Sequence, residues 1–446
     1  MNQSEKSYSL RQVAMIGGAI TTTAIFTVFG PAWCRSVHAS LQDSPKAIVD
    51  QVWQLVNREY IDSTFNKKDW LAIRQSLLSK NYTSPKQAYA AIRNALEQLQ
   101  DPYTRFMEPR HYKALTSQTS GEISGIGIRM KMSEQTNILT VVEALENSPA
   151  SKAGIKAGDQ ILAIDGKPTV LMRIQDASRL IRGKVGSVIT LRVGRMGNPT
   201  LNLKLTRASI EVPTVRSAIR TEGDRRVGYI RLREFNAHAS EQMAKAIRKL
   251  DRQKVDAFVL DLRGNPGGLL QSSIEIARMW LDEGAIVGTV DRRGSSELTK
   301  ANKTALTKRP LAVLVDENSA SASEILTGAL KDNKRAIVVG NQTYGKALVQ
   351  SVHELIDGSG LAITIAHYYT PKGTDINYKG ITPDIKIKLT EAQERQLAAN
   401  PQLIGTKNDP QYARTWAVLS NNYLAQPLRN LPSRSAVFPQ APVKRF

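Results

Sequence analysis

The spacing of apolar residues changes twice along this chain of 446 residues, and each change marks a different kind of fold. Between about 45 and 114, apolar side chains recur at helical spacing among many charges, which predicts a small helical domain. From about 115 to 207, short alternating runs are broken by glycine, a pattern typical of a β-rich module. From about 212 to 390, apolar strands alternate with helical stretches, which predicts an α/β core.

Length and composition agree with a multidomain α/β protein. At about 100–200 residues per domain, the chain holds two or three folded units. Its hydrophobic content of 41% and charged content of 23% exclude a disordered chain and a multi-span membrane protein. The expected parts are a leader (1–39), a helical domain (40–114), a β-rich module (115–207), an α/β core (208–390), and a helical extension with a basic tail (391–446).

The N-terminus has the features of an export signal. Lys6 and Arg11 precede an uncharged, mostly apolar run over 13–28, and small residues lead up to Ala39. This pattern predicts a secretory signal peptide cleaved after Ala39, and an uncleaved signal anchor is the alternative because the run is long. The single cysteine, Cys34, lies in this leader, so the mature chain is expected to lack thiols, which suits an oxidising compartment.

The chain is strongly basic, with a formal net charge of +21. Removing the leader takes away three cations and one acid, so the mature chain keeps a charge of +19. Nucleic acid is excluded as the partner because the cations are spread over every segment, no zinc-finger or helix–turn–helix pattern occurs, and only 6% of residues are aromatic. We interpret the charge as attraction to anionic membrane surfaces or to acidic substrate tails.

A serine-rich segment, Ser319-Ala320-Ser321-Ala322-Ser323-Glu324, follows an apolar strand and begins a helix expected to reach Asp332. A serine at this position lies at the positive end of the helix dipole, beside free backbone N–H groups that can hold an oxyanion. Ser321 and Glu324 also match a capping box, which is common at helices without any activity. Taken alone, the segment favours the capping role.

A nucleophilic serine needs a base, and none of the five histidines accompanies a Gly-x-Ser-x-Gly motif. A buried lysine is the second solution, because burial lowers its pKa and frees the amine to accept a proton. Lys346 follows Gly345 and precedes an apolar run, although most such lysines only extend their ammonium groups to water. Gln350 projects to the same face as Lys346 and has an amide that can orient the amine.

Several segments, in chain order, resemble the carboxyl-terminal processing (tail-specific) proteases. The segments are Asp261-Leu262-Arg263-Gly264-Asn265-Pro266-Gly267-Gly268, Ser319 to Ile325, Ala329 to Ala336, Thr343 to Lys346 with Val349-Gln350, and Tyr368 to Gly373. The resemblance extends from roughly 45 to 390. It implies an α/β serine protease core of the crotonase-like type and calls for no cofactor or metal.

The resemblance also assigns roles to particular residues. It implies that Ser321, rather than a neighbouring serine, is the nucleophile, that Lys346 is the general base, and that Gln350 supports the lysine. The oxyanion hole is expected at the N–H groups of Ala322 and Gly267. Two positions depart from the family pattern, because Asn318 and Ala347 both stand where glycine is usual. Asn tolerates left-handed backbone, whereas Ala347 requires negative φ.

The β-rich module resembles a PDZ domain. The resemblance lies in Gly125-Ile126-Gly127-Ile128, the loop from Ser148 to Ile155 and the turn from Gly158 to Gly166. The glycines leave backbone N–H groups in a notch that suits a C-terminal carboxylate, and the following strand can pair with an incoming peptide. A helix around 176–181 is expected to form the other wall. The first loop alone favours a plain glycine-rich hairpin, and the second loop and the turn together reverse that preference.

These features together predict an exported serine endopeptidase of the periplasm or thylakoid lumen. Its partners would be proteins or peptides with exposed C-termini, cut near that end through an acyl-enzyme. Relatives in photosynthetic bacteria and plastids mature a photosystem II reaction-centre protein, and others trim periplasmic proteins. The alternative is a catalytically silent PDZ scaffold of the cell envelope, which the two departures from the pattern support and the intact serine, lysine and glutamine oppose.

Overall fold

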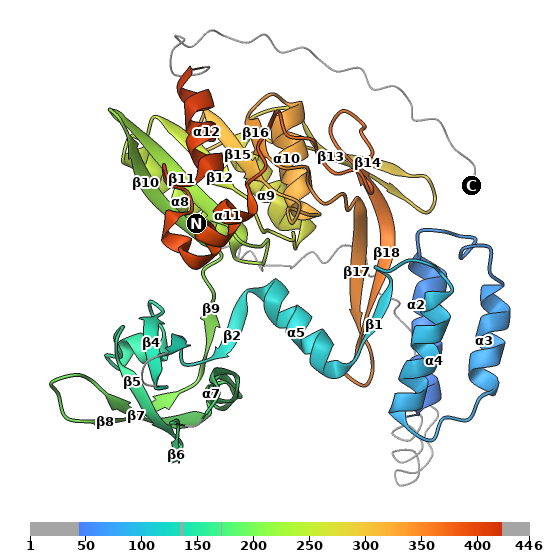
Figure 1. Ribbon diagram of the computed structural model, residues 1–446. Helices are drawn as coiled ribbons and strands as arrows, with labels where there is room; N and C mark the ends of the chain where they lie inside the picture. The colour runs from blue at the N-terminus through green and yellow to red at the C-terminus, as the bar shows by residue number, and fades with distance from the viewer. Residues whose placement is uncertain (1–43, 134–136, 171, 422–446) are drawn as a thin grey trace, which may run out of the picture.

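The computed structural model describes residues 44–133, 137–170 and 172–421. The predicted leader over 1–39, with Cys34, lies outside these ranges, as does the expected basic tail over 425–446. Figure 1 shows three bodies, which are a group of N-terminal helices, a β-rich module and a larger α/β core. None of the helices within the described ranges is long and apolar enough to cross a membrane.

The N-terminal helices are α2 (Pro45–Glu59), α3 (Trp70–Ser79) and α4 (Pro85–Glu97). Side chains of Ser44 and Asp69 cap the first two, because their oxygens accept backbone N–H groups of the first turn. The region expected to be helical also contains a strand, β1 (Arg105–Met107), which pairs with β18 (Gly360–Tyr369) of the core. Sequence periodicity missed β1 because three residues are too few to show alternation.

Two short strands join the β-rich module to the rest of the chain. Helix α5 (Pro109–Ser120) continues through the boundary expected at 114/115, and β2 (Glu122–Gly125) follows it. The returning strand β9 (Ala208–Glu211) pairs antiparallel with β2. The module is therefore joined to the rest of the chain through these two paired strands, as Figure 1 shows.

The module itself is a small antiparallel sheet with two helices. Its strands, in spatial order, are β3 (Ile128–Met132), β4 (Leu139–Ala144), β5 (Gln160–Ile164), β7 (Val188–Gly194) and β8 (Leu201–Thr206), with β6 (Lys167–Pro168) beside β5. The helices are α6 (Pro149–Lys152) and α7 (Ile174–Ile181). The predicted β-rich texture and the helix near 176–181 are both confirmed.

The core contains a six-stranded sheet in the order β10 (Val215–Glu222), β11 (Arg225–Leu232), β12 (Ala257–Asp261), β15 (Leu311–Val315), β16 (Ile337–Gly340) and β19 (Ile385–Lys386). Only the edge strand β10 runs antiparallel to its neighbour. Every residue of β12 and β15 is buried, because helices cover both faces of the sheet. These helices are α8 (Ala239–Arg252), α9 (Leu270–Trp280) and α10 (Ala322–Asp332) on one face and α12 (Pro410–Leu419) on the other.

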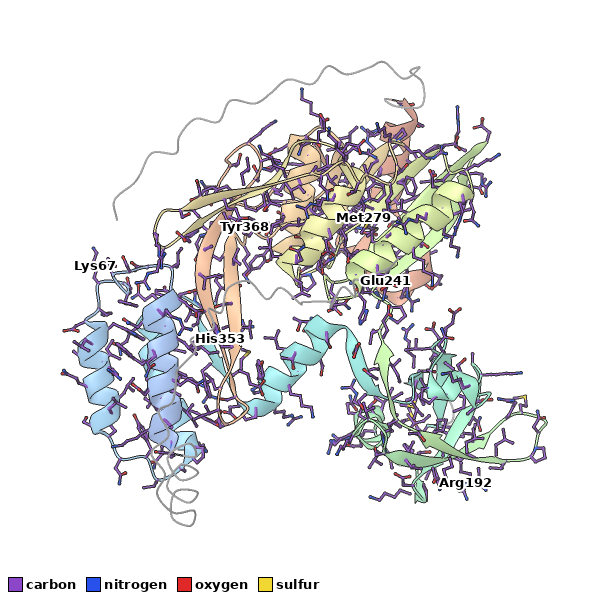
Figure 2. All side chains as sticks on the ribbon, turned by 180° about the vertical axis from the view of Figure 1, so that it is seen from behind. Lys67, Arg192, Glu241, Met279, His353 and Tyr368 are labelled. Atoms are coloured by element: carbon purple, nitrogen blue, oxygen red, sulfur yellow. The ribbon has the colours of Figure 1, made fainter. Side chains whose placement is uncertain are left out.

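A second sheet extends from the core toward the N-terminal helices. It has the order β1, β18, β13 (Ala285–Asp291) and β14 (Ser296–Lys300), with β17 (Leu348–Glu354) also paired to β18. In Figure 2, Tyr368 lies at the core end of this arm and His353 lies nearer the helices. His353 Nε2 is 2.6 Å from Glu59 Oε2 on α2, which fixes the arm to the helices. Helix α11 (Glu391–Ala399) and the 3₁₀ turn η1 (Pro401–Leu403) precede α12.

Candidate active site

Ser321 lies directly before the first residue of α10, after the buried strand β15. Its backbone has φ 54° and ψ −113°, a strained combination for a residue with a side chain. The next N–H, that of Ala322, has no hydrogen-bond acceptor among the described residues. The serine thus lies at the positive end of a helix beside an available donor, as the sequence predicted.

The structure separates Ser321 from its two neighbouring serines, which sequence alone did not. Ser319 Oγ donates to the carbonyl of Leu262 at 2.9 Å, and Ser323 Oγ donates to the carbonyl of Asn265 at 2.9 Å. Both of these serines are fully buried, whereas Ser321 is partly exposed. Ser319 and Ser323 therefore have structural roles, and Ser321 is the one of the three that is accessible.

Glu324 joins the helix start to the loop that carries Lys346. Its Oε2 accepts the backbone N–H of Ser321 at 2.8 Å and that of Lys346 at 2.9 Å. Its Oε1 accepts the N–H of Gly345 at 2.7 Å and the hydroxyl of Thr343 at 2.6 Å. Burial raises the pKa of the carboxyl group, while these four hydrogen bonds act in the opposite direction. Glu324 supplies the carboxylate half of the predicted capping box, while its own N–H donates to the carbonyl of Ser321 at 2.8 Å, and it fixes the two backbones side by side.

Tyr368 of β18 ties the same two backbones from their carbonyl side. Its hydroxyl lies 3.1 Å from the carbonyl oxygen of Ser321 and within hydrogen-bonding distance of the carbonyl oxygen of Lys346. The phenol ring is fully buried, and one hydroxyl hydrogen can serve only one of these acceptors at a time. The strained conformation of Ser321 is therefore held at both its N–H and its carbonyl.

Lys346 occupies the loop before β17 and directs its amine at Gln350. Nζ donates to Gln350 Oε1 at 2.6 Å and lies 4.7 Å from the centre of the Tyr103 ring. Burial and the nearby charge of Arg105 lower the pKa of the Lys346 ammonium to about 8, against the opposing charges of Asp101 and Glu324. The amine makes no hydrogen bond to Ser321 in this structure.

Gly267 lies against Ser321. A Cβ added to it would be 3.0 Å from Ser321 Cβ and 2.7 Å from the carbonyl oxygen of Ala320, so only glycine fits there. Its N–H, however, donates to Asn265 Oδ1 at 2.9 Å. A role for this N–H in holding an oxyanion therefore requires that hydrogen bond to be shared or broken.

The two departures from the family pattern fit this backbone. Neither Asn318 nor Ala347 is among the residues with positive φ, and the side chain of Ala347 is buried in the core. The condition that the sequence placed on Ala347 is therefore met. None of the histidines in the described part of the chain hydrogen-bonds to Ser321.

The β-rich module carries a groove between β3 and α7. Its lining includes the four residues predicted to bind peptide, Gly125, Ile126, Gly127 and Ile128, together with Ile181 of α7, around a cavity of about 70 Å³. The N–H groups of Ile126 and Gly127 have no acceptor within the described ranges. Gly127 has φ 80°, and a Cβ there would lie 2.3 Å from Ser148 Cβ. The notch is thus suited to a carboxylate, and the groove beside it to an extended peptide.

Sequence reasoning missed three contributors to the site. Tyr103 lies against the Lys346 amine, the hydroxyl of Tyr368 lies against the Ser321 carbonyl, and the side chain of Asn265 accepts the N–H of Gly267. Nothing in the local sequence around these three residues predicts those contacts. Their positions depend on β1, β18 and the turn after β12 meeting at one edge of the core. The spacing of residues in the sequence does not predict which distant segments come into contact.

The α/β core, with a serine at a helix start and a separate groove-bearing module, defines a serine-type peptidase with a PDZ domain. The model of peptidase family S41 matches residues 226–387, and that of the PDZ domain matches residues 140–195. A carboxyl-terminal-processing protease of Picosynechococcus sp. is 41% identical over 414 residues, which is 93% of this chain and 97% of the relative.

Other relatives agree. The chloroplastic carboxyl-terminal-processing peptidase 2 of Arabidopsis thaliana is 43% identical over 346 residues, covering 75% of this chain and 67% of the relative. A solved structure, the photosystem II D1 C-terminal processing protease, has 34% identity and a TM-score of 0.53, covering 83% of this chain and 99% of that one. The chain belongs to the carboxyl-terminal-processing protease family, whose members are serine-type peptidases acting near the C-termini of proteins. A silent scaffold is not favoured.

Proposed function

We propose that Ser321 is the nucleophile of this peptidase and Lys346 its general base. The observation that carries the proposal is that Glu324 joins the backbones of Ser321 and Lys346. Partial burial also lowers the pKa of the Lys346 ammonium to about 8, which leaves a useful neutral fraction near neutrality. Glu324 and Tyr368 hold the backbones of both residues together. Gln350 accepts one N–H of the amine and so directs its lone pair.

The reaction follows from these positions. Neutral Lys346 takes the proton of Ser321 Oγ as the oxygen attacks the carbonyl carbon of the scissile peptide bond. The oxyanion receives the N–H of Ala322, and that of Gly267 once Asn265 Oδ1 releases it. The protonated lysine then gives its proton to the leaving amine, which leaves an ester on the serine. Lys346 then takes a proton from a water molecule that attacks this ester, and returns the proton to Ser321 Oγ as the acid product leaves, which restores the enzyme.

The PDZ groove selects the substrate. The free N–H groups of Ile126 and Gly127 receive the C-terminal carboxylate of a protein, and the preceding residues add a strand beside β3. We divide the chain functionally into the helical part (40–114), the PDZ domain (115–207), the peptidase core (208–390) and the C-terminal extension from 391. The binding and cutting functions then belong to the second and third of these.

The physiological substrate that we propose is a photosystem II reaction-centre protein processed at its C-terminus. The solved relative is a photosystem II D1 processing protease, and curated relatives come from cyanobacteria and chloroplasts. The enzyme would then be exported to the thylakoid lumen or periplasm, where its positive charge draws it to anionic membranes. Mass spectrometry of protein C-termini in thylakoid and envelope fractions of a deletion strain tests this, since uncut precursors should accumulate. Unchanged termini of all photosystem II proteins would reject the substrate.

A peptide assay tests the catalytic proposal directly. The full chain should cleave a peptide with a free C-terminal carboxylate and resist the same peptide when its C-terminus is amidated. Ser321→Ala should abolish cleavage while leaving binding of the free-carboxylate peptide intact. Full turnover by Ser321→Ala would reject the assignment of the nucleophile.

A further inference from the structure

Arginine residues meet where the PDZ domain approaches the core. In the register of β10 and β11, Arg216 lies directly opposite Arg231. Arg233 follows two residues after Arg231, so its side chain leaves the chain toward the same face of the sheet. Like charges directly opposite each other destabilise an antiparallel pair. Their placement here therefore calls for negative charge nearby, part of which the chain itself supplies.

The PDZ domain adds a fourth arginine. Arg129 of β3 donates to Glu143 Oε2 of β4 at 2.8 Å, and Arg216 of the core lies 3.5 Å from the same oxygen. One carboxylate of the PDZ domain is thus shared between two guanidinium groups from different domains. We call Arg129, Arg216, Arg231 and Arg233 the arginine cluster.

Two members of the arginine cluster lack full partners. Arg231 Nε is buried without a hydrogen-bond acceptor in the described ranges. Its neighbour on β12, Asp261, feels the charge of Arg231 but is hydrogen-bonded by Arg263 at 2.6 Å and 2.9 Å. Arg233 makes no side-chain hydrogen bond or ion pair within the part of the chain that the structure describes. Burial and the charges of the other three arginines lower the pKa of its guanidinium group, which agrees with this crowding.

One member of the cluster lies on a strand of the peptide groove, and another lies two residues from a segment that contacts Gly267. Arg129 is on β3, the strand that an incoming peptide would extend, and it is exposed while its neighbours Ile128 and Met130 line the groove. Alternate side chains of an added strand would therefore project toward the side of Arg129. Arg233 is close in sequence to the site around Ser321. Phe235, two residues after Arg233, donates its N–H at 2.9 Å to the carbonyl of Gly267, which lies against Ser321.

We propose that the arginine cluster binds carboxylate side chains of the substrate tail, so that the enzyme selects acidic residues just before the C-terminus. This deepens the proposed function and rests on it, because the PDZ groove must first hold the tail. Guanidinium groups suit the purpose, since their paired N–H groups match a carboxylate in two-point hydrogen bonds. A peptide is favoured over a membrane as the partner because Arg129 lies on β3, the strand that an incoming tail would extend.

Binding of two matched peptides to the full-length Ser321→Ala protein tests the proposal. The peptides are fluorescein-labelled and end in the same apolar residue, with three Glu before it in one and three Gln in the other. The acidic peptide should bind about fivefold more tightly or better at low salt, and the preference should shrink as salt rises. Adding Arg233→Gln should reduce the preference below about twofold while the neutral peptide binds unchanged.

Two further variants keep the result interpretable. Arg216→Gln should act like Arg233→Gln, whereas Arg293→Gln, an exposed arginine at the β13–β14 turn, makes the same change of charge elsewhere and should keep the preference. Thermal melting checks that each variant folds. Equal binding of both peptides by the parent protein, or equal weakening of both by Arg233→Gln, would overturn the proposal.

A sedimentation assay with vesicles of anionic phospholipid separates the membrane alternative. If Arg233→Gln reduces vesicle binding and keeps the peptide preference, the cluster is a membrane contact and the proposal is wrong. Failure of the proposed function has a different signature, because an amidated peptide would then bind as well as its free-carboxylate form. If only the preference for the acidic peptide is absent, the arginine proposal fails and the proposed peptidase function is unaffected.

Discussion

Around Ser321, buried polar groups fix the position of each neighbouring backbone. The PDZ groove instead leaves the backbone N–H groups of Ile126 and Gly127 without acceptors among the residues that the structure describes. The first region must place a nucleophile and a base in one geometry before substrate arrives, so its hydrogen bonds are internal. The second must accept tails of different sequence, so its hydrogen bonds are kept for the ligand. Damage to the two regions should therefore differ in kind, with losses in kcat from one and in KM from the other.

The largest effect should come from the nucleophile. Ser321→Ala should lower kcat by about 10⁴-fold or more, because no other hydroxyl can form the acyl-enzyme. Ser323→Ala is the matched control, since it removes a hydroxyl two residues away that only bonds the carbonyl of Asn265. It should cost about 1–3 kcal/mol of unfolding free energy and keep most activity. Steady-state kinetics and chemical denaturation give both numbers, and equal losses of activity would contradict the distinction between the serines.

Removing the base should cost somewhat less. Lys346→Ala should lower kcat by about 10²–10⁴-fold, since the serine proton then has only water as its acceptor. Lys331→Ala is a suitable control, because Lys331 pairs with Asp384 at 2.7 Å on the surface of the core. Its activity should match that of the wild type. A Lys346→Ala enzyme that turns over at the wild-type rate would remove lysine from the mechanism.

Glu324→Gln tests whether the buried carboxylate positions the site. The two carboxylate oxygens accept four hydrogen bonds. Glutamine replaces one oxygen by an NH₂ group, which is a donor and cannot accept hydrogen bonds from the N–H and O–H groups that face it. We expect kcat to fall about 10²-fold with little change in KM, together with a loss of about 1–3 kcal/mol of unfolding free energy. Thermal unfolding run beside the kinetics separates the two effects. Wild-type kcat in this variant would show that the four hydrogen bonds do not position the two residues.

The groove should respond more mildly and in KM. Gly127→Ala forces a side chain into a backbone with φ 80° and against Ser148, so it distorts the carboxylate notch. We expect KM for a tailed substrate to rise about tenfold with kcat nearly unchanged. Gly166→Ala shares the strain, with φ 76°, but has open space around it and should leave KM alone. A fall in kcat rather than a rise in KM would mean that the two regions are not separable in this way.

The sequence was most informative where the chemistry is local. The serine run, the helix to Asp332 and the shared face of Lys346 and Gln350 all follow from periodicity and motif order, and the structure has them as expected. The second sheet and strand β1 were not predicted, because they arise from pairing between segments far apart in the chain. For the same reason Tyr103 and Tyr368 could not be recognised as neighbours of the site. Local pattern identifies which groups can react, and tertiary pairing determines which groups surround them.

The pH dependence of kcat/KM for a tailed peptide without titratable side chains tests the serine–lysine mechanism most directly. Only the neutral amine of Lys346 can act as base, and burial lowers the pKa of that group to about 8. Below this pH the neutral fraction shrinks, so kcat/KM should rise about tenfold per pH unit and level off above the pKa. A profile that is flat from mildly acidic to basic pH, or that levels off near about 6.5 as a histidine base would require, would contradict the account.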